Sequence, residues 1–229
     1  MNGGRIVCIG EAMAELAPVE DGLYRLGFAG DTLNTAWYLR ALLAPEWHVA
    51  FASALGDDPV SGGLAAFVAG AGIGTEGLMI RPGLACGLYL IRLVEGDRQF
   101  AYWRGQSAAR TLARDAGELA GAIGPADWLH LSGITLAILP PEDRTRLLAE
   151  VARRRAAGAR VSFDPNYRPR LWETPEAARD WTARAAALSD LAFPSVSDEA
   201  ALWGDADPGA AARAVQSRAA SGVSQSRGR

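Results

Sequence analysis

The chain has 229 residues, of which 49% are hydrophobic and 21% charged, and this composition is typical of one large globular domain. Its formal net charge of −3 favours neither nucleic acid nor an anionic membrane as partner, and no apolar run reaches the length of a membrane span or a signal peptide. All 23 basic residues are arginine. Because a Walker loop and Schiff-base catalysis both need lysine, those two chemistries are excluded. Since the N-terminal sequence does not have the pattern of a signal peptide, we expect a cytoplasmic protein.

The first part of the chain alternates short apolar runs with helical patterns. We predict strands at residues 5–10 and 49–54, and helices at 32–43 and 59–71, the second helix ending at the Gly-Ala-Gly turn of residues 70–72. Two further strands, 87–94 and 98–103, follow with only the turn 95–97 between them, which predicts a β-hairpin. Period-two alternation places Phe100, Tyr102 and Arg104 on one face of this hairpin. Core packing is the favoured role of this face, although two rings and a guanidinium also suit a lid over a carboxylate ligand.

The second part of the chain continues the alternation. Strands are predicted at 128–132, 160–164 and 191–193, and helices at 142–157 and 175–188. Alternation of this kind implies parallel strands joined by right-handed helical crossovers, hence a doubly wound α/β sheet. Residues 207–215 have the pattern of another helix, whereas residues 216–229 have the polar, aperiodic composition of a disordered tail.

The turn before the first predicted helix is a candidate ligand site. Gly30 allows a tight turn and a close approach of the backbone to a ligand. Asp31 or Thr32 can cap the helix that follows, so that its free N–H groups face the ligand. Asn34 adds a donor and an acceptor, which suits a ligand rich in hydroxyl groups.

Other candidate residues follow the strands, because ligands of open α/β sheets bind outside the carboxyl ends of the strands. The loop 164–172 holds a carboxylate, an amide and two guanidiniums and is stiffened by two prolines, and a binding role is favoured for it. Residues 195–199 read equally well as a ligand loop and as the cap of a short helix. The loops at 10–11 and 132–135 are the remaining candidates.

Several reactive residue types have simpler explanations. Cys8 and Cys86 lie among apolar neighbours, and we interpret them as two buried thiols rather than a disulfide or a metal pair. His130, inside an apolar strand, is interpreted as a core residue. The acidic pair Asp57 and Asp58 precedes Pro59 and is interpreted as a helix cap, so no metal site is predicted.

Taken together, these stretches resemble the ribokinase-like, PfkB-type sugar kinases, most closely the 2-keto-3-deoxygluconate kinases. The resemblance extends over about residues 5 to 215 in family order. It rests on residues 9–16, Gly30-Asp31-Thr32-Leu33-Asn34-Thr35, residues 54–58, 87–90, 100–104, 131–139, Phe163-Asp164-Pro165-Asn166-Tyr167-Arg168-Pro169-Arg170-Leu171-Trp172 and residues 198–204.

The resemblance implies a mostly parallel sheet with helices on both faces and a small β lid, with lid strands around residues 11–30 and 86–104. It implies that ATP, with Mg²⁺, phosphorylates the terminal hydroxyl of 2-keto-3-deoxygluconate. The substrate-binding residues that match the family are Gly30, Asp31, Asn34, Tyr89, Tyr102, Arg104 and Arg168, with Arg168 at the position that pairs with the sugar carboxylate. Ser195 and Asp198 fall where ribokinases carry the Asn and Glu that assist the nucleotide. A homodimer through the lid is also implied.

One family feature has no match in the sequence. These kinases use a Gly-Ala-Gly-Asp motif that supplies an anion hole and a catalytic base, and no Gly-X-Gly-Asp occurs here, so no catalytic residue is assigned. We therefore expect residues 1–215 to be an incomplete kinase domain, followed by a tail, 216–229, that a frameshift would explain. The alternatives are a non-catalytic sugar-acid-binding protein and a kinase for another sugar, such as fructose.

Overall fold

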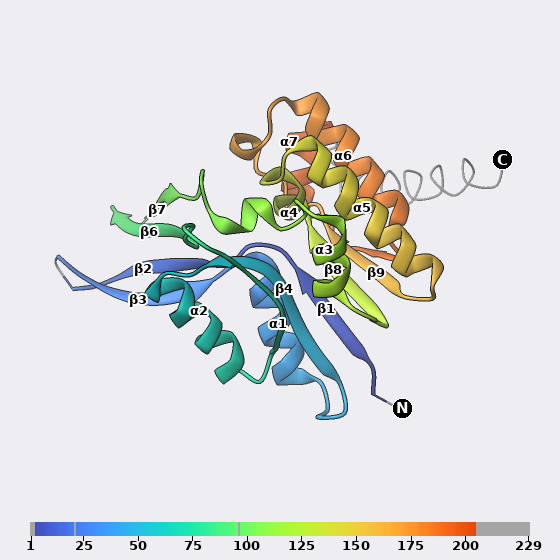
Figure 1. Cartoon of the computed structure of the whole chain (residues 1–229). Coiled ribbons are helices and arrows are strands. Elements are labelled where there is room, and N and C mark those ends of the chain that lie inside the picture. The colour runs from blue at the N-terminus through green and yellow to red at the C-terminus, as the bar shows by residue number, and fades with distance from the viewer. Residues whose placement is uncertain (1–2, 21, 96, 205–229) are drawn as a thin grey trace.

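The computed structural model describes residues 3–20, 22–95 and 97–204 (Figure 1). Its larger sheet has the strand order β10-β9-β8-β1-β4-β5, and every neighbouring pair in it is parallel. The bounds of these strands are β1 Arg5–Ile9, β4 His48–Gly56, β5 Gly74–Arg81, β8 Trp128–Ser132, β9 Arg160–Asp164 and β10 Leu191–Ala192. The chain builds outward from β1 first to one side and then to the other, so the topological switch point lies between β1 and β8.

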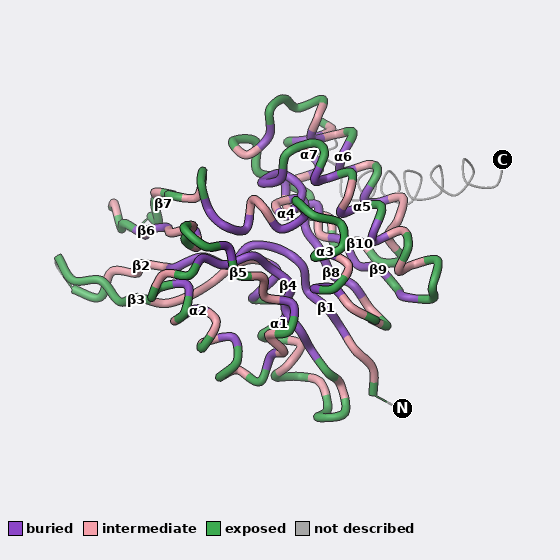
Figure 2. The backbone as a smooth tube through the Cα atoms, viewed as in Figure 1, coloured by how far each residue is buried: buried purple, intermediate pink, exposed green. Residues whose placement is uncertain are grey.

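Helices cover both faces of this sheet. α1 and α2 lie on one face, and α3, α5 and α6 lie on the other (Figure 1). Their bounds are α1 Asp31–Leu42, α2 Pro59–Gly70, α3 Ala116–Ile123, α5 Pro141–Ala156 and α6 Pro175–Leu188. Along β1, Val7 and Ile9 join one core cluster while Cys8 joins the other, which is why the strand reads as continuously apolar. Figure 2 shows the central strands as mostly buried (purple). The predicted doubly wound fold is confirmed.

The smaller sheet is a four-stranded lid of order β3-β2-β6-β7. β2 pairs with β6 in parallel, whereas β2–β3 and β6–β7 are antiparallel, so the predicted hairpin is confirmed. The bounds of the lid strands are β2 Met13–Glu20, β3 Leu23–Ala29, β6 Gly87–Val94 and β7 Asp97–Trp103. These lie within the two ranges expected for lid strands.

Short elements complete the described chain. They are the 3₁₀ turns η1 Ala108–Thr111 and η2 Pro169–Leu171, and the helices α4 Gly133–Ala137 and α7 Val196–Trp203. Of the longer elements, β5 and α3 have no counterpart among the strands and helices predicted from the sequence. β5 carries two glycines and a glutamate in its first four positions, and α3 has only eight residues, so neither presents a long periodic pattern. The predicted helix in 207–215 and the tail 216–229 lie outside the described residues.

The two cysteines differ from each other. Cys8 is fully buried and Cys86 is half-buried at the base of the lid, and both are free thiols. The prediction of a buried thiol is correct for Cys8 and wrong for Cys86, because Cys86 precedes the first residue of β6, where the core gives way to the lid. In the described part of the chain, no helix has both the length and the hydropathy that a membrane crossing requires.

Candidate functional site

Asp31 is the meeting point of three segments at the carboxyl ends of the central strands. Its carboxylate accepts hydrogen bonds from the Ser132 hydroxyl, at the end of β8, and from the Asn166 amide, 3.0 Å away in the loop after β9. Gly30, just before it, is extended, and a Cβ there would collide with the Glu11 carbonyl oxygen, so this position needs glycine for steric reasons. The turn therefore packs against the loop that follows β1.

The expectation that Asp31 or Thr32 caps α1 is wrong. The helix begins at Asp31, its N-cap is Gly30, and no side chain makes the capping bond. Asp31 is instead the first helical residue, and its carboxylate reaches across to Ser132 and Asn166. Asn34 is exposed on the same helix, and its side chain has no hydrogen bond within the described chain. The backbone N–H groups of the first turn of α1 therefore lie beside the Asp31 carboxylate, which Ser132 and Asn166 hold in one orientation.

The loop after β9 holds this arrangement in place. Asn166 has a φ of 35°, in the left-handed region that asparagine tolerates, and its backbone N–H donates to Asp164 at 3.0 Å. Burial raises the pKa of Asp164 to about 6, and the nearby carboxylates of Asp31 and Asp198 act in the same direction. The Asn166 N–H and Arg168 oppose the shift. Asp31 and Asp164 thus lie in the same cluster of loops. The Asp31 carboxylate accepts two side-chain hydrogen bonds, whereas burial favours the protonated form of Asp164.

Arg168 directly precedes the 3₁₀ turn η2, as its N-cap residue, and its side chain is half exposed. Its guanidinium donates to the Tyr167 carbonyl at 2.8 Å and lies 3.3 Å from the Asp198 carboxylate. Ser195 caps α7, its hydroxyl accepting the backbone N–H of Asp198 at 3.1 Å. The capping interpretation of residues 195–199 is confirmed. Asp198 consequently faces the arginine rather than open solvent.

The aromatic residues of the lid stack beside one another. Tyr102 stacks on Phe100 with centroids 6.1 Å apart, and Tyr89 lies 5.8 Å from Tyr102. The Tyr89 hydroxyl donates to Glu15 on β2, and burial together with this bond raises its pKa. Phe100 and Tyr102 remain 45% and 53% exposed, so the core-packing interpretation of this face is wrong. The lid projects beyond the core, and its rings face a cleft.

Arg104, at the end of β7, is held by a buried carboxylate. Glu11 follows β1, its side chain is 1% exposed, and it accepts hydrogen bonds from Arg104 and from the Ser107 hydroxyl. Burial raises the pKa of Glu11, while the Arg104 guanidinium lowers it. This pair ties the base of the lid to the central strand.

A cleft of about 660 Å³ lies between the lid and the loops after β8 and β9. Tyr102, Arg104 and Arg168 are the predicted substrate-binding residues that line it; the other lining residues are Phe100, Ile134, Pro169, Arg170 and Leu171. Gly30, Asp31, Asn34 and Tyr89 are not part of its wall. The size suits a small polar molecule, and three guanidiniums with two rings suit one that combines hydroxyl groups with a negative charge.

Arg144 on α5 was not identified from the sequence. Its side chain is 1% exposed, donates to the Leu136 carbonyl at 2.8 Å, and forms two hydrogen bonds with Glu173, of 3.0 and 2.7 Å. Its guanidinium lies 4.9 Å from the centroid of the Trp172 ring, and it lowers the pKa of Glu173. Because α4 and η2 form two walls of the cleft, this one side chain connects them. An arginine in an amphipathic helix carries no sequence signal of such a role.

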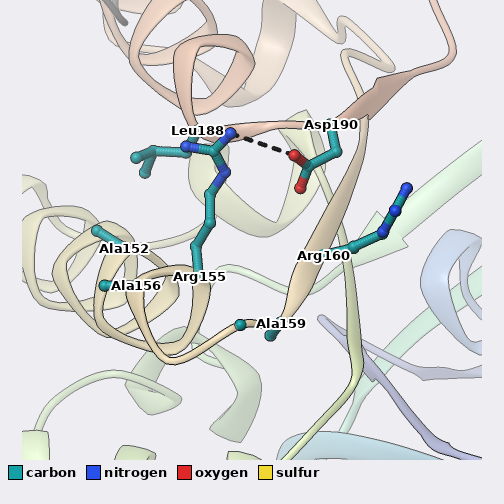
Figure 3. Close-up of a pocket in the computed structure, with 8 residues that line it drawn as sticks. Ala152, Arg155, Ala156, Ala159, Arg160, Leu188 and Asp190 are labelled. Carbon is teal, nitrogen blue, oxygen red and sulfur yellow. Dashed lines mark hydrogen bonds and ion pairs between the residues drawn. The ribbon is translucent and has the colours of Figure 1, made fainter.

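A second cleft, of about 500 Å³, lies at the opposite end of β9 (Figure 3). Arg155 and Asp190 form an ion pair of 3.1 Å across it, and Asp190 also accepts the backbone N–H of Val161 at 2.9 Å. Arg160 also lines this cleft, and its side chain has no hydrogen bond or ion pair with the described residues. This cleft lies at the amino ends of the strands, away from the switch point, so the first cleft is the better candidate site.

A doubly wound sheet with a cleft at its switch point, closed by a β lid, defines an α/β protein that binds a small polar molecule. A family model described as "pfkB family carbohydrate kinase" matches residues 4–226. A 2-dehydro-3-deoxygluconokinase from Dickeya dadantii (strain 3937) is 39% identical over 209 residues, which is 90% of this chain and 67% of that protein. The chain belongs to the PfkB family of carbohydrate kinases. It spans about two thirds of the length of the curated relatives it matches.

Solved structures agree with this assignment. The PfkB protein from Polaromonas sp. JS666 superposes with a TM-score of 0.81 at 30% identity, covering 94% of this chain and 74% of that one. A fructokinase from Vibrio cholerae O395, in a form with fructose, ADP and calcium ion bound, gives a TM-score of 0.81 at 21% identity and covers 95% and 68%. The second likeness shows the fold alone.

Proposed function

We propose that this protein binds 2-keto-3-deoxygluconate in the cleft between the lid and the β9 loop, as part of an ATP-dependent sugar-acid kinase that forms the 6-phosphate. The observation that carries the proposal is the set of guanidiniums on the cleft wall, because a guanidinium binds a carboxylate more strongly than it binds the hydroxyl groups of a neutral sugar. The name of the Dickeya dadantii relative supports the same substrate.

The described residues have distinct tasks in this proposal. Arg168 pairs with the carboxylate of the sugar acid, and Tyr102 packs against its carbon chain. Asp31 lies outside the cleft wall, so in this proposal the hydroxyl end of the sugar extends past the wall to the Asp31 carboxylate, which Ser132 and Asn166 orient. A network whose members are already aligned loses little entropy when a ligand binds.

The nucleotide fits the described residues less well. Ser195 is engaged as a helix cap and Asp198 faces Arg168, so neither presents a free group to MgATP. Their role in nucleotide binding stays a prediction. Because the sequence has no Gly-X-Gly-Asp, we expect the 229-residue chain to bind the sugar acid without transferring phosphate.

The test is calorimetric titration of the chain with 2-keto-3-deoxygluconate and, separately, with fructose. The sugar acid should bind more tightly, and Arg168→Gln should weaken it by about 10-fold or more while leaving fructose almost unchanged. Tighter binding of fructose would favour the neutral-sugar alternative. A coupled assay for ADP release, run on the same samples, separates binding from turnover.

We also propose that two copies associate through the outer face of the lid. Strand register places Tyr24, Leu26 and Trp103 on the face opposite the cleft, where they are 42%, 50% and 59% exposed. A lid with an apolar outer face favours burial against another surface. Sedimentation equilibrium should show a dimer, and Leu26→Glu should shift it to monomer.

A further inference from the structure

The three arginines that line the cleft differ in the charges that face them. Arg104 is paired with the buried Glu11 carboxylate, and Arg168 lies 3.3 Å from Asp198. Arg170 has neither a hydrogen bond nor an ion pair with any residue in the described ranges 3–20, 22–95 and 97–204. Of the positive charges on the cleft wall, the one on Arg170 is therefore not compensated by the protein.

The backbone holds Arg170 in a defined place. It is the middle residue of η2, between Pro169, whose ring fixes its φ angle, and Leu171, which packs against the main core. The next residue, Trp172, is buried beneath the Arg144 guanidinium. An exposed side chain on so firmly anchored a turn loses little backbone entropy when it binds a ligand.

A compensated arginine and a free one contribute differently to binding. A ligand carboxylate that approaches Arg104 or Arg168 also meets the field of Glu11 or Asp198, so much of the attraction cancels. These two arginines act mainly as oriented hydrogen-bond donors, and each attracts an anion less strongly than an uncompensated guanidinium does. Arg170 attracts a negative charge with no opposing carboxylate at its side.

We propose that Arg170 is the specificity-determining residue that makes this cleft prefer an anionic sugar over a neutral one of the same shape. The inference rests on the proposed function, since it concerns which residue of that same site selects the carboxylate. Arg168 orients the carboxylate by direct contact, and Arg170 supplies the net charge.

The experiment compares 2-keto-3-deoxygluconate with its methyl ester, which has the same skeleton without the charge. Calorimetry at low and at physiological salt measures both ligands on the unmodified chain and on Arg170→Gln. The variant should bind the acid about 10-fold more weakly, because a hydrogen bond between an exposed guanidinium and a carboxylate contributes about a factor of 10 to affinity. Binding of the ester should not change, because the ester has no charge to pair with Arg170. The salt dependence of acid binding should fall at the same time.

Two further variants test the compensation argument. Asp198→Asn removes the carboxylate that faces Arg168 and should strengthen acid binding about 3-fold or more, by adding a second uncompensated charge. Arg92→Gln is the matched control: Arg92 is an exposed arginine on the lid, on the face opposite Tyr89 and Tyr102, and its replacement should change neither ligand.

The outcomes separate the two proposals. If Arg170→Gln weakens the acid and the ester equally, or neither, while Arg168→Gln still weakens the acid, the inference is overturned and the proposed function stands. If the unmodified chain binds neither ligand, the proposed function fails and the inference fails with it.

Discussion

Replacing Arg144 by methionine should destabilise the fold far more than a typical surface change. Methionine retains most of the buried volume, but it leaves the Leu136 carbonyl without its donor and the Glu173 carboxylate without its counter-charge. An unsatisfied buried acceptor costs about 1–3 kcal/mol, and breaking a buried ion pair costs about 3–5 kcal/mol. Because the Glu173 side chain is 52% exposed, water recovers part of the second cost, and we expect a loss of about 3 kcal/mol.

The assay is urea unfolding followed by tryptophan fluorescence, with the free energy of unfolding taken by linear extrapolation. Arg184→Met is the matched control. Arg184 also stacks on a tryptophan, 4.8 Å from the centroid of Trp181, but its side chain is 57% exposed, and the expected loss is below about 1 kcal/mol. A loss below about 1 kcal/mol for Arg144→Met, or equal losses for the two variants, would refute the reasoning.

Three further outcomes follow from the structure. The pKa of Asp164 is raised from 3.8 to about 6 in the folded state, so the folded protein loses stability as the pH rises through that interval and Asp164 ionises. Asp164→Asn should therefore be more stable than the parent by about 1–2 kcal/mol at pH 8. Urea titrations should show that this gain vanishes below about pH 4. Asp58→Ala should cost about 1–2 kcal/mol in the same assay, since Asp58 caps α2 through the N–H groups of Val60 and Ser61; an unchanged midpoint would contradict the cap. In a thiol titration with Ellman's reagent, the half-buried Cys86 should react in the native protein and the buried Cys8 only after denaturation, so two fast thiols would contradict the core assignment.

The sequence predicted the elements whose patterns are long and locally consistent. β1 is apolar from Ile6 to Ile9 and β8 is apolar except for His130 and Ser132, because both faces of these strands are covered, and α6 begins at a proline after a threonine cap. β5 was missed because its side chains are determined by packing against β4 and α3, which no local pattern reveals. Local periodicity therefore predicts the larger sheet except for its edge strand β5.

The candidate site was predictable to the level of loops but not of contacts. The strand-end rule brought residues 132–135 and 164–172 beside the Gly30 turn, and the Asp31–Ser132–Asn166 network joins those segments. The partners of the charged residues could not be foreseen. Arg104 pairs with Glu11 across 93 positions, and such a choice depends on how the lid sits on the sheet.

The order in which the site is put together differs from the order in which its parts are synthesised. Asp31 leaves the ribosome early, with the strand that becomes the centre of the sheet, but its two partners lie 101 and 135 residues later in the chain. Contacts this distant along the chain form late in folding, because long loops must close first. The Asp31 carboxylate of a nascent chain thus lacks at least one of its two partners until β9 has emerged and paired. A ligand that needs all three residues therefore recognises only molecules whose sheet is complete as far as β9.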